Sequence, residues 1–432
     1  MKRKIEAKLE QWKNNRVHRK PLLVHGARQV GKTYILQKFG AEKFFNVVYV
    51  NFEVNLSLGA LFQDDIEPRK IIRYLEASSG KAIIPGQTLI YLDEIQSCER
   101  ALTSLKYFCE EAPEYHVVAA GSLLGVAINR KQYSFPVGKV ETLTLCPMDF
   151  EEYLWARGKE VLAQEIKNAY EKMQPLSEGL HLQAVELYKE YLIVGGMPEA
   201  VKTFVEEGSF LNVQNVQNEI LNNYVADMAK YATNAESVKI RACYNSIPAQ
   251  LAKNNKKFQY KIVQRGGSAT IFGESIEWLN FAGVVLKCQR LSQAVEPLDA
   301  YADYSAFKLY LGDIGLLTVK TGIALQTILG VGDNVFMGAM AENYVAQQLA
   351  AKGRKLYYWE SQSSAEVDFV LQKDNTIIGI EVKSGEHVRS RSLSVFTAAY
   401  KPTYNIRFSL RNFREMGNLK AIPLYAVFCT YL

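Results

Sequence analysis

The chain lacks any run of 18 apolar residues, so the sequence predicts no membrane-spanning helix and no membrane partner. Residues 1–6 are mostly charged and lack the apolar core of a secretory signal, which favours a cytoplasmic location. The six cysteines are scattered without a C-x-x-C pair, as is typical of reduced thiols rather than of disulfides or metal ligands. The sequence also has no internal repeat and no low-complexity stretch.

The composition that remains is that of a globular protein with several domains. The 432 residues are 48% hydrophobic and 22% charged, which is ordinary for folded proteins. A chain of this length predicts about two to four domains. The net charge of +6 permits an anionic partner such as DNA without requiring one.

One octapeptide carries most of the functional information. Residues 26–33 read Gly-Ala-Arg-Gln-Val-Gly-Lys-Thr, which is the phosphate-binding pattern G-x-x-x-x-G-K-[ST]. Gly26 and Gly31 allow a tight loop whose backbone N–H groups face phosphate oxygens. Lys32 can reach the β- and γ-phosphates, and Thr33 can ligate Mg²⁺. The pattern therefore predicts ATP and Mg²⁺ as ligands.

The segments that flank this loop support the prediction. Residues 21–25 read as a buried strand, and residues 33–39 read as a helix that Gly40 ends. A strand, a loop and a helix in this order favour a nucleotide site over a glycine-rich turn without a ligand. The expected nucleotide contacts are the loop and the residues that follow it: Gly26, Ala27, Arg28, Gln29, Val30, Gly31, Lys32, Thr33 and Tyr34.

Further strands supply candidate catalytic groups. Residues 47–52 predict a second strand, and residues 88–94 predict a third that is apolar and ends in two acids. Asp93 would hold Mg²⁺, and Glu94 would polarise the attacking water. The alternative is a strand that ends in solvated acids, but a phosphate loop some 60 residues earlier favours the catalytic interpretation.

Two more strands complete the expected parallel sheet. Residues 116–122 end in Ser122, which is either a sensor of the γ-phosphate or an ordinary N-cap serine. Residues 139–145 read as a fifth strand and lead into the stretch Leu-Cys-Pro-Met-Asp-Phe-Glu-Glu-Tyr-Leu.

This order of motifs resembles a family of bacterial and archaeal AAA+-like (ASCE-type) P-loop ATPases. Members carry a C-terminal domain of unknown function that is similar to restriction-endonuclease-like folds. Residues 191–200 and 311–317 also fit the family. The resemblance runs over nearly the whole chain and implies ATP binding and hydrolysis.

One position departs from the family pattern. The family often has Gly-Arg before the fifth strand, whereas this chain has Gly138-Lys139. Lysine lacks the planar fork of arginine, so any role of that arginine at the γ-phosphate is weakened here. Arg28 and Arg130 are other cationic candidates, and each is more readily interpreted as a surface charge.

The middle of the chain predicts two helical regions. Residues 156–234 would form a lid, in which Gly195-Gly196 breaks a helix as a hinge or as part of the nucleotide site. Residues 235–330 resemble a winged helix with wing strands at 284–286 and 307–311. Its third helix, from Ser268, carries acids and no basic residue, which disfavours base reading. Non-specific phosphate contact or inter-domain packing remain as roles for a nearby basic cluster: Lys253, Lys256, Lys257, Lys261 and Arg265.

The last segment, residues 331–432, predicts an α/β domain. Its expected elements are the helices 336–351 and 389–400 and the strands 356–359, 366–372, 376–383, 404–410 and 421–428. This order resembles the restriction-endonuclease core with its PD-(D/E)-x-K signature.

The alternation of residues along these strands suggests a second metal site. Asp368 and Glu381 would hold Mg²⁺, Lys383 would orient water, and Glu342 would add a carboxylate. The spacing alone is weak, and the alternative is a nuclease-like fold that serves as a scaffold without cutting DNA.

The sequence thus predicts an α/β protein with four parts: an ATPase domain (1–155), a helical lid (156–234), a winged-helix-like domain (235–330) and a nuclease-like domain (331–432). The expected function is Mg²⁺-dependent ATP hydrolysis by a protein that associates with DNA without sequence specificity. The alternative is a nucleotide-switched ATPase that binds a protein partner or assembles as a homo-oligomer.

Overall fold

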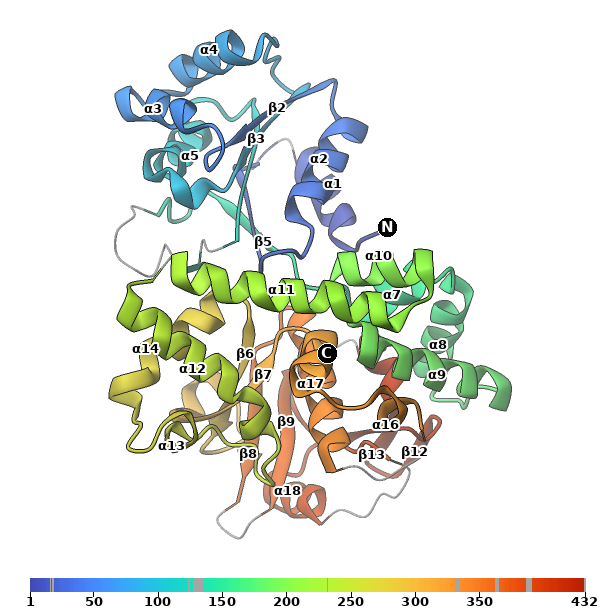
Figure 1. Ribbon diagram of the computed structural model, residues 1–432. Helices are drawn as coiled ribbons and strands as arrows, with labels where there is room; N and C mark the ends of the chain where they lie inside the picture. Colours follow the sequence, from blue (N-terminus) through green and yellow to red (C-terminus); the bar gives the residue numbers. More distant parts are fainter. Residues whose placement is uncertain are drawn as a thin grey trace. The chain divides into compact units, whose positions relative to one another are not determined.

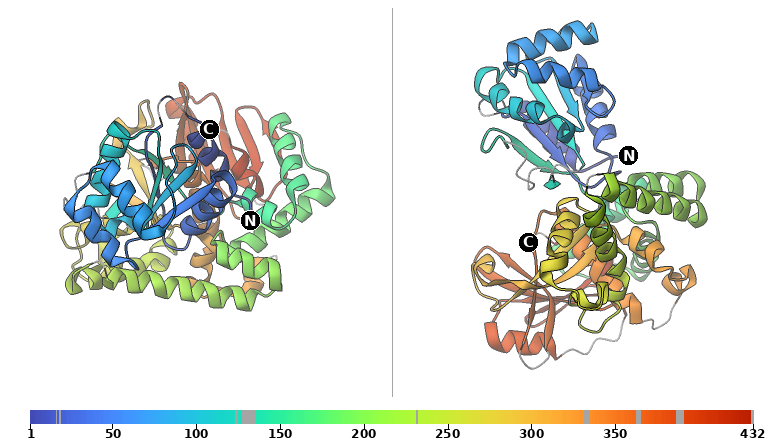
Figure 2. Two further views of the ribbon diagram at one scale, coloured as in Figure 1. Left: turned by 90° about the horizontal axis from the view of Figure 1, so that it is seen from above. Right: turned by 60° about the vertical axis from the view of Figure 1, so that its left-hand side comes forward.

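The structure is a computed structural model that describes residues 1–432 except 16, 18, 123–124, 127–134, 231, 331–334, 362–364, 386–390 and 431–432. The chain divides into two compact units (Figures 1 and 2). The N-terminal unit comprises Lys2–Cys146 with Phe281–Gly283, and the C-terminal unit comprises Met1, Pro147–Asn280 and Val284–Leu432.

The N-terminal unit is built on a five-stranded sheet in the order β2-β3-β4-β1-β5. All neighbouring strands are parallel. β4 lies between the strand that precedes the phosphate loop and the strand that ends in the two acids. The strands are β1 (Leu22–His25), β2 (Asn46–Asn51), β3 (Thr88–Asp93), β4 (His116–Gly121) and β5 (Glu141–Thr144).

Helices cover both faces of this sheet, with α3, α4 and α5 on one side and α1 and α2 on the other (Figure 1). This double cover explains why β3 is buried at every position, as an apolar parallel strand must be. The helices are α1 (Ile5–Asn14), α2 (Lys32–Lys43), α3 (Leu56–Asp64), α4 (Pro68–Ser79), η1 (Ile95–Ser97) and α5 (Glu99–Glu111).

Gly40 does not end the helix after the phosphate loop, in contrast to the sequence prediction. Helix α2 continues to Lys43. A Cβ atom at Gly40 would lie 2.6 Å from Cγ2 of Val47, so this glycine lets α2 approach β2 closely. The residue is therefore a packing glycine within the helix and not a stop signal.

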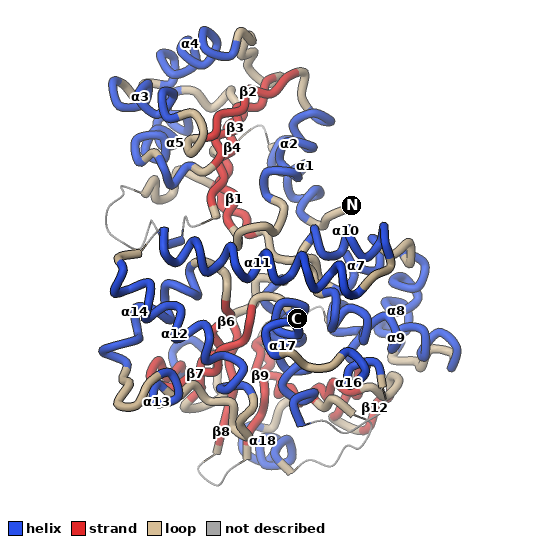
Figure 3. The backbone as a smooth tube through the Cα atoms, viewed as in Figure 1, coloured by secondary structure: helices blue, strands red, loops and turns tan. Residues whose placement is uncertain are grey.

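The C-terminal unit contains an eight-stranded mixed sheet in the order β12-β13-β11-β10-β9-β8-β6-β7 (Figure 3). The expected wing strands are β6 and β7, and they do not stand apart as a wing. Cys288 to Leu291 of β6 pair in parallel with Leu356 to Trp359 of β8 and so extend the C-terminal sheet. The strands are β6 (Val285–Leu291), β7 (Ala302–Leu311), β8 (Leu356–Glu360), β9 (Glu366–Lys373), β10 (Thr376–Val382), β11 (Asn405–Ser409), β12 (Arg414–Met416) and β13 (Leu419–Pro423).

Helices surround this sheet. α17 packs on β6, β7, β8 and β10, and α18 packs on β9 and β10. The helices are α7 (Phe150–Ala156), α8 (Glu160–Lys172), α9 (Glu178–Val194), α10 (Pro198–Glu207), α11 (Phe210–Lys230), α12 (Asn234–Leu251), α13 (Tyr260–Val263), α14 (Ala269–Phe281), η2 (Leu298–Tyr301), α15 (Ile314–Thr321), α16 (Leu325–Leu329), α17 (Val335–Ala351), α18 (Ser392–Tyr400) and η3 (Leu424–Cys429).

The last expected strand, 421–428, is only partly extended. β13 ends at Pro423, and Leu424–Cys429 forms the buried 3₁₀ helix η3. Proline has no N–H for a sheet ladder, which explains why pairing stops there.

Both family-like stretches of the middle region meet in one buried contact. Gly195 and Gly196 separate α9 from α10, and Asp313 caps α15. The Asp313 carboxylate accepts hydrogen bonds from the N–H groups of Gly196 at 2.6 Å and Leu316 at 3.1 Å. The glycine pair is thus a fixed packing contact.

Helix α17 joins the same contact. Gln347 Nε2 donates to Asp313 Oδ2 at 3.1 Å and to the Tyr191 hydroxyl at 3.0 Å. The backbone N–H of Phe150 donates to Gln348 Oε1 at 3.0 Å. Segments that the sequence analysis assigns to all four domains therefore share one buried polar cluster.

The close packing at Gly196 generates a stability prediction. A Cβ atom there would lie 2.1 Å from the carbonyl oxygen of Met148, which is backbone and cannot rotate away. We expect Gly196→Ala to lower the free energy of unfolding by about 3 kcal/mol. The matched control is Gly179→Ala in α9, where the added methyl meets nothing within 4 Å. Urea unfolding of both variants measures the difference, and equal midpoints would contradict the packing argument.

Candidate functional site

The phosphate loop connects β1 to α2 in the N-terminal unit. Gly26, Gln29 and Gly31 have φ angles of 155°, 65° and 92°, so the loop depends on backbone conformations that most residues avoid. A Cβ atom at Gly26 would lie 2.1 Å from the carbonyl oxygen of Leu145. Only glycine therefore fits at the start of the loop.

Lys32 lies across the inside of this loop. Its ammonium group donates to the carbonyl oxygens of Gly26 and Ala27, both at 2.8 Å, and the residue is buried. The side chain is thus held at the position where a phosphate would sit beside the loop. The nine predicted contact residues differ widely in solvent exposure. Tyr34 on α2 is 61% exposed, whereas Val30 in the loop is fully buried.

The acid at the tip of β3 reaches the phosphate loop. Thr33 Oγ1 donates to Asp93 Oδ2 at 3.0 Å, and the N–H of Glu94 donates to Asp93 Oδ1 at 3.1 Å. Asp93 is buried. Two residues 60 positions apart are thus brought together, as the sequence predicts. A hydroxyl and a carboxylate oxygen side by side form a donor set that suits Mg²⁺.

Glu94 lies next to this pair in an uncommon backbone conformation. Its φ angle is 50°, and its Oε2 accepts a hydrogen bond from Gln96 Nε2 at 2.6 Å. Non-glycine residues with positive φ are concentrated at functional sites. Ser122 is buried and directly follows β4, the strand between β1 and β3. It therefore lies at the sheet edge where the loop and the acids meet.

Two residues at this edge were not found by sequence reasoning. The Tyr49 hydroxyl donates to Asp93 Oδ2 at 3.0 Å, and Asn51 Nδ2 donates to the Tyr49 oxygen at 3.2 Å. Burial, with the nearby Asp93 charge, raises the pKa of Tyr49 and keeps its hydroxyl protonated. The sequence shows that β2 ends in polar residues. It does not show that β2 lies beside β3, which is what brings Tyr49 to Asp93.

The other cationic candidates lie elsewhere. Lys139 forms an ion pair with Glu110 at 2.8 Å on the surface of α5, and Arg130 lies outside the described residues. Arg28 is part of the loop itself.

The predicted nuclease-like residues lie where β9 pairs irregularly with β8 and regularly with β10. Tyr357 pairs with Val370 and Trp359 with Val367, so β9 advances three residues where β8 advances two. The pairing of β9 with β10 is regular, with Phe369 opposite Ile380, so the next pair in this register is Asp368 and Glu381. Over the described ranges, no group of three His, Cys, Asp or Glu side chains could hold a metal ion.

Each of these acids has its own partners. Asp368 Oδ2 accepts from the N–H of Val382 at 2.8 Å. Glu381 is bonded by Arg407 Nε at 2.8 Å and lies 3.2 Å from Lys383 Nζ. Glu342 on α17 is paired with Lys256 and Lys308 instead.

Lys308 is the centre of this acidic cluster. Its side chain is 0% exposed, bonds Glu366 and lies 3.6 Å from Glu342 Oε2. Burial opposes its charge, but Glu342, Glu366 and Asp368 together outweigh burial and raise the pKa of Lys308. Burial and the Glu342 charge raise the pKa of Asp368. A buried lysine thus balances the charges of Glu342 and Glu366.

The predicted basic cluster is also engaged within the unit. Lys253 Nζ donates to Gln259 Oε1 at 2.9 Å, Lys256 pairs with Glu342, and Lys257 pairs with Glu360 at 2.6 Å. Three of its five members are therefore bonded internally.

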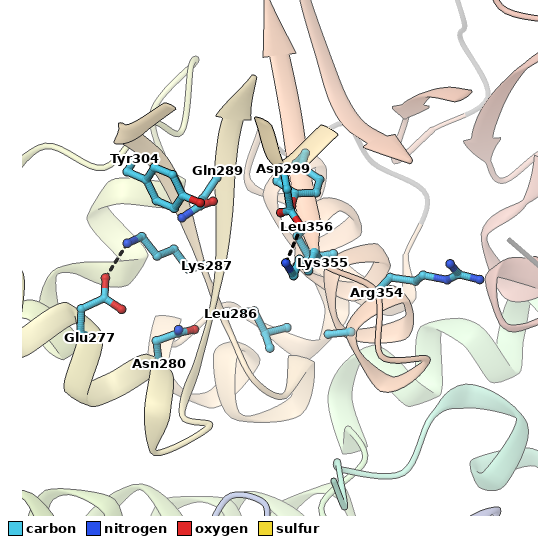
Figure 4. Close-up of a pocket in the computed structure, with 12 residues that line it drawn as sticks. Glu277, Asn280, Leu286, Lys287, Gln289, Asp299, Tyr304, Arg354, Lys355 and Leu356 are labelled. Carbon is cyan, nitrogen blue, oxygen red and sulfur yellow. Dashed lines mark hydrogen bonds and ion pairs between the residues drawn. The ribbon is translucent and has the colours of Figure 1, made fainter. Parts of the chain in front are cut away.

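A cavity of about 570 Å³ lies in the C-terminal unit, and residues of α14, β6 and the start of β8 are among those that line it (Figure 4). Lys287 pairs with Glu277 at 2.5 Å and Lys355 with Asp299 at 2.6 Å. Arg354 extends away from Lys287 (Figure 4). The charges of both lysines are thus balanced at the cavity wall.

Comparison with protein families divides the chain into three segments. Residues 18–154 match an AAA domain. Residues 185–327 and 337–427 match two domains of unknown function, DUF8612 and DUF4143. The boundary between the last two falls between β7 and β8, although the strands on either side belong to one sheet. Among the described residues, no helix is long and apolar enough to cross a membrane.

Curated relatives and solved structures add little beyond the fold. Uncharacterized proteins from Mycobacterium bovis and Mycobacterium tuberculosis are 37% identical over 78 residues, which is 18% of this chain and 17% of each relative. The Walker-type ATPase PABY2304 of Pyrococcus abyssi is 15% identical and has a TM-score of 0.45, with 73% of this chain and 94% of that chain covered. The ORC2 protein of Aeropyrum pernix is 13% identical with a TM-score of 0.34, over 79% and 95% of the two chains. The match to an AAA domain and the parallel sheet with its phosphate loop give the N-terminal unit an AAA-like P-loop fold.

Proposed function

We propose that the protein binds ATP and hydrolyses it with Mg²⁺ at the edge of the N-terminal sheet. One observation carries this proposal: Thr33 Oγ1 lies 3.0 Å from Asp93 Oδ2, with the phosphate loop directly before Thr33. The hydroxyl of the phosphate loop and the acid at the end of β3, which act together on a nucleotide in this class of ATPase, thus lie side by side.

The phosphate loop and Lys32 bind the phosphates of ATP in this proposal. The N–H groups of residues 26–33 and the start of α2 provide donors for phosphate oxygens. Lys32 exchanges its two carbonyl partners for the β- and γ-phosphates, which are stronger acceptors because they are charged. Thr33 and Asp93 would hold Mg²⁺, which supplies charge neutralisation of the phosphates when it is bound.

Hydrolysis requires a group that activates water. Glu94 has a carboxylate next to Asp93 and acts as the general base, with its orientation fixed by Gln96. Ser122 at the tip of β4 contacts the γ-phosphate. These roles extend the sequence predictions for Glu94 and Ser122.

We further propose that the C-terminal unit is a scaffold that binds a protein partner and does not cleave DNA. Glu342, one of the acids predicted for the metal site, already pairs with Lys256 and Lys308, and Lys308 also pairs with Glu366. The internal bonds of Lys253, Lys256 and Lys257 leave fewer free cations for a DNA backbone. These contacts favour the nucleotide-switched interaction protein over the DNA-associated enzyme.

The ATPase proposal predicts opposite effects for two variants. We expect Lys32→Ala to abolish binding of a fluorescent ATP analogue, because the phosphates lose their only lysine within the loop. We expect Glu94→Gln to keep that binding and to lower kcat by about 10²- to 10⁴-fold, because the amide cannot accept a proton from water.

The controls are Lys8→Ala on α1 and Glu111→Gln on α5, both of which change exposed side chains. Phosphate release and analogue binding are measured for all four variants. Turnover of Glu94→Gln at the wild-type rate would remove the proposed role of Glu94.

The buried ion cluster predicts a large stability effect. We expect Lys308→Met to lower the free energy of unfolding of the C-terminal unit by about 3–5 kcal/mol, because it leaves buried carboxylates unpaired. Lys355→Met breaks an exposed pair and should cost less than about 1 kcal/mol. Urea unfolding followed by circular dichroism compares them. A Lys308→Met protein as stable as Lys355→Met would show that Lys308 does not neutralise the cluster.

The scaffold proposal predicts that duplex DNA leaves ATP turnover unchanged within about twofold at low salt. Glu94→Gln reports background phosphate release in the same assay. Stimulation by DNA that falls steeply as salt rises would be evidence for phosphate-backbone contacts and would restore the DNA-associated alternative.

A further inference from the structure

We propose that Tyr49 is a positioning residue that holds the Asp93 carboxylate ready for the metal ion. This inference rests on the proposed function. Asp93 Oδ2 accepts two hydroxyl donors at 3.0 Å, from Thr33 and from Tyr49, while Oδ1 accepts the N–H of Glu94 at 3.1 Å. The two oxygens of the carboxylate are thus fixed from three directions.

Strand pairing places Tyr49 at this position. β2 and β3 are parallel, with Asn51 opposite Asp93 and Tyr49 opposite Tyr91. Alternate residues share a sheet face, so Tyr49 lies one step behind Asp93 on the neighbouring strand. Its ring packs on Tyr91 with centroids 5.1 Å apart, which directs the phenol oxygen along the sheet toward the acid.

Asn51 determines which way the phenol proton points. Asn51 Nδ2 donates to the Tyr49 oxygen at 3.2 Å, so that oxygen acts as an acceptor on one side. A tyrosine hydroxyl has a single proton, which is then available only for Asp93. The chain Asn51, Tyr49, Asp93 is therefore directional and ends on the carboxylate as a donated hydrogen bond.

The hydroxyl groups of Thr33 and Tyr49 have different roles in this arrangement. Thr33 gives its proton to Asp93 and keeps its oxygen lone pairs for a metal ion. Tyr49 on β2 donates to the same carboxylate, and we assign it no direct contact with the metal ion. Removing a residue that hydrogen-bonds to a metal ligand commonly lowers metal affinity by about 10- to 100-fold.

The test is Tyr49→Phe, which removes one oxygen atom and keeps the ring that packs on Tyr91. The probe is Mn²⁺ in the presence of a non-hydrolysable ATP analogue, with free Mn²⁺ followed by electron paramagnetic resonance. We expect the dissociation constant of Mn²⁺ to rise about tenfold. Binding of the analogue in EDTA should not change, and a high Mg²⁺ concentration should restore kcat to within about twofold of wild type.

Tyr74→Phe on α4 is the matched control, because that ring is 39% exposed and lies outside the site. Asp93→Asn serves as the reference for loss of the metal ligand. An unchanged thermal unfolding midpoint establishes that each variant is folded.

The outcomes separate this inference from the function on which it rests. If Tyr49→Phe binds Mn²⁺ as wild type does while Asp93→Asn does not, Tyr49 has no positioning role and the ATPase proposal stands. If the wild type shows no nucleotide-dependent Mn²⁺ binding, the proposed function itself fails. A loss in Tyr49→Phe that high Mg²⁺ does not restore would indicate general damage to the site and would also overturn the inference.

Discussion

The packing of the C-terminal unit depends on the hydrogen bonds that the carboxylate of Asp313 accepts. It caps α15, accepts the N–H of Gly196 and binds Gln347 of α17, so three parts of the chain meet at two oxygen atoms. Burial raises the pKa of Asp313 to about 6, and the surrounding N–H donors favour the charged form. The glycines at 195, 196 and 315 follow from this contact, because a Cβ atom at each would lie less than 3.0 Å from neighbouring atoms. The stretches 191–200 and 311–317 are thus two sides of one packing arrangement.

Buried carboxylates have different partners in the two units. In the N-terminal unit, Asp93 meets only neutral hydroxyl and N–H donors among its described hydrogen bonds, so its charge stays available to a cation. In the C-terminal unit, Glu342 and Glu366 meet the ammonium of Lys308, which is fully buried. A buried carboxylate without a counter-charge is costly, so an enclosed cluster of acids is stabilised either by a metal or by a lysine.

The parts of the proposed ATPase site that can be read from the sequence are local. The loop, the strand before it and the acids at the end of β3 are each read from a few consecutive residues, and parallel strands necessarily bring their ends to one edge. Tyr49 was missed because its role depends on β2 lying beside β3, which is a tertiary fact. The capping box that begins α7, with Asp149 and Glu152, was readable from its spacing.

Prediction failed where distant strands decide the outcome. Strands β6 and β7 pair with each other near the predicted positions, but β6 also pairs with β8, which begins more than 40 residues after β7 ends. The register of β9 with β10 continues to Asp368 and Glu381, whereas the ion pairs of Lys308 on β7 with Glu342 and Glu366 depend on tertiary contacts that the sequence does not show. Pro423 could have signalled the end of β13, because a proline interrupts a ladder.

The sheet that crosses the boundary between the two domains of unknown function also restricts how this protein can have evolved. β6 and β7 come from one matched segment, and β8 to β13 come from the other. A chain that lost or exchanged the second segment would expose the edge of β6 from Cys288 to Leu291, and open edges recruit strands of other molecules. Recombination between these two segments is therefore expected to be selected against, and relatives should inherit them as a single piece.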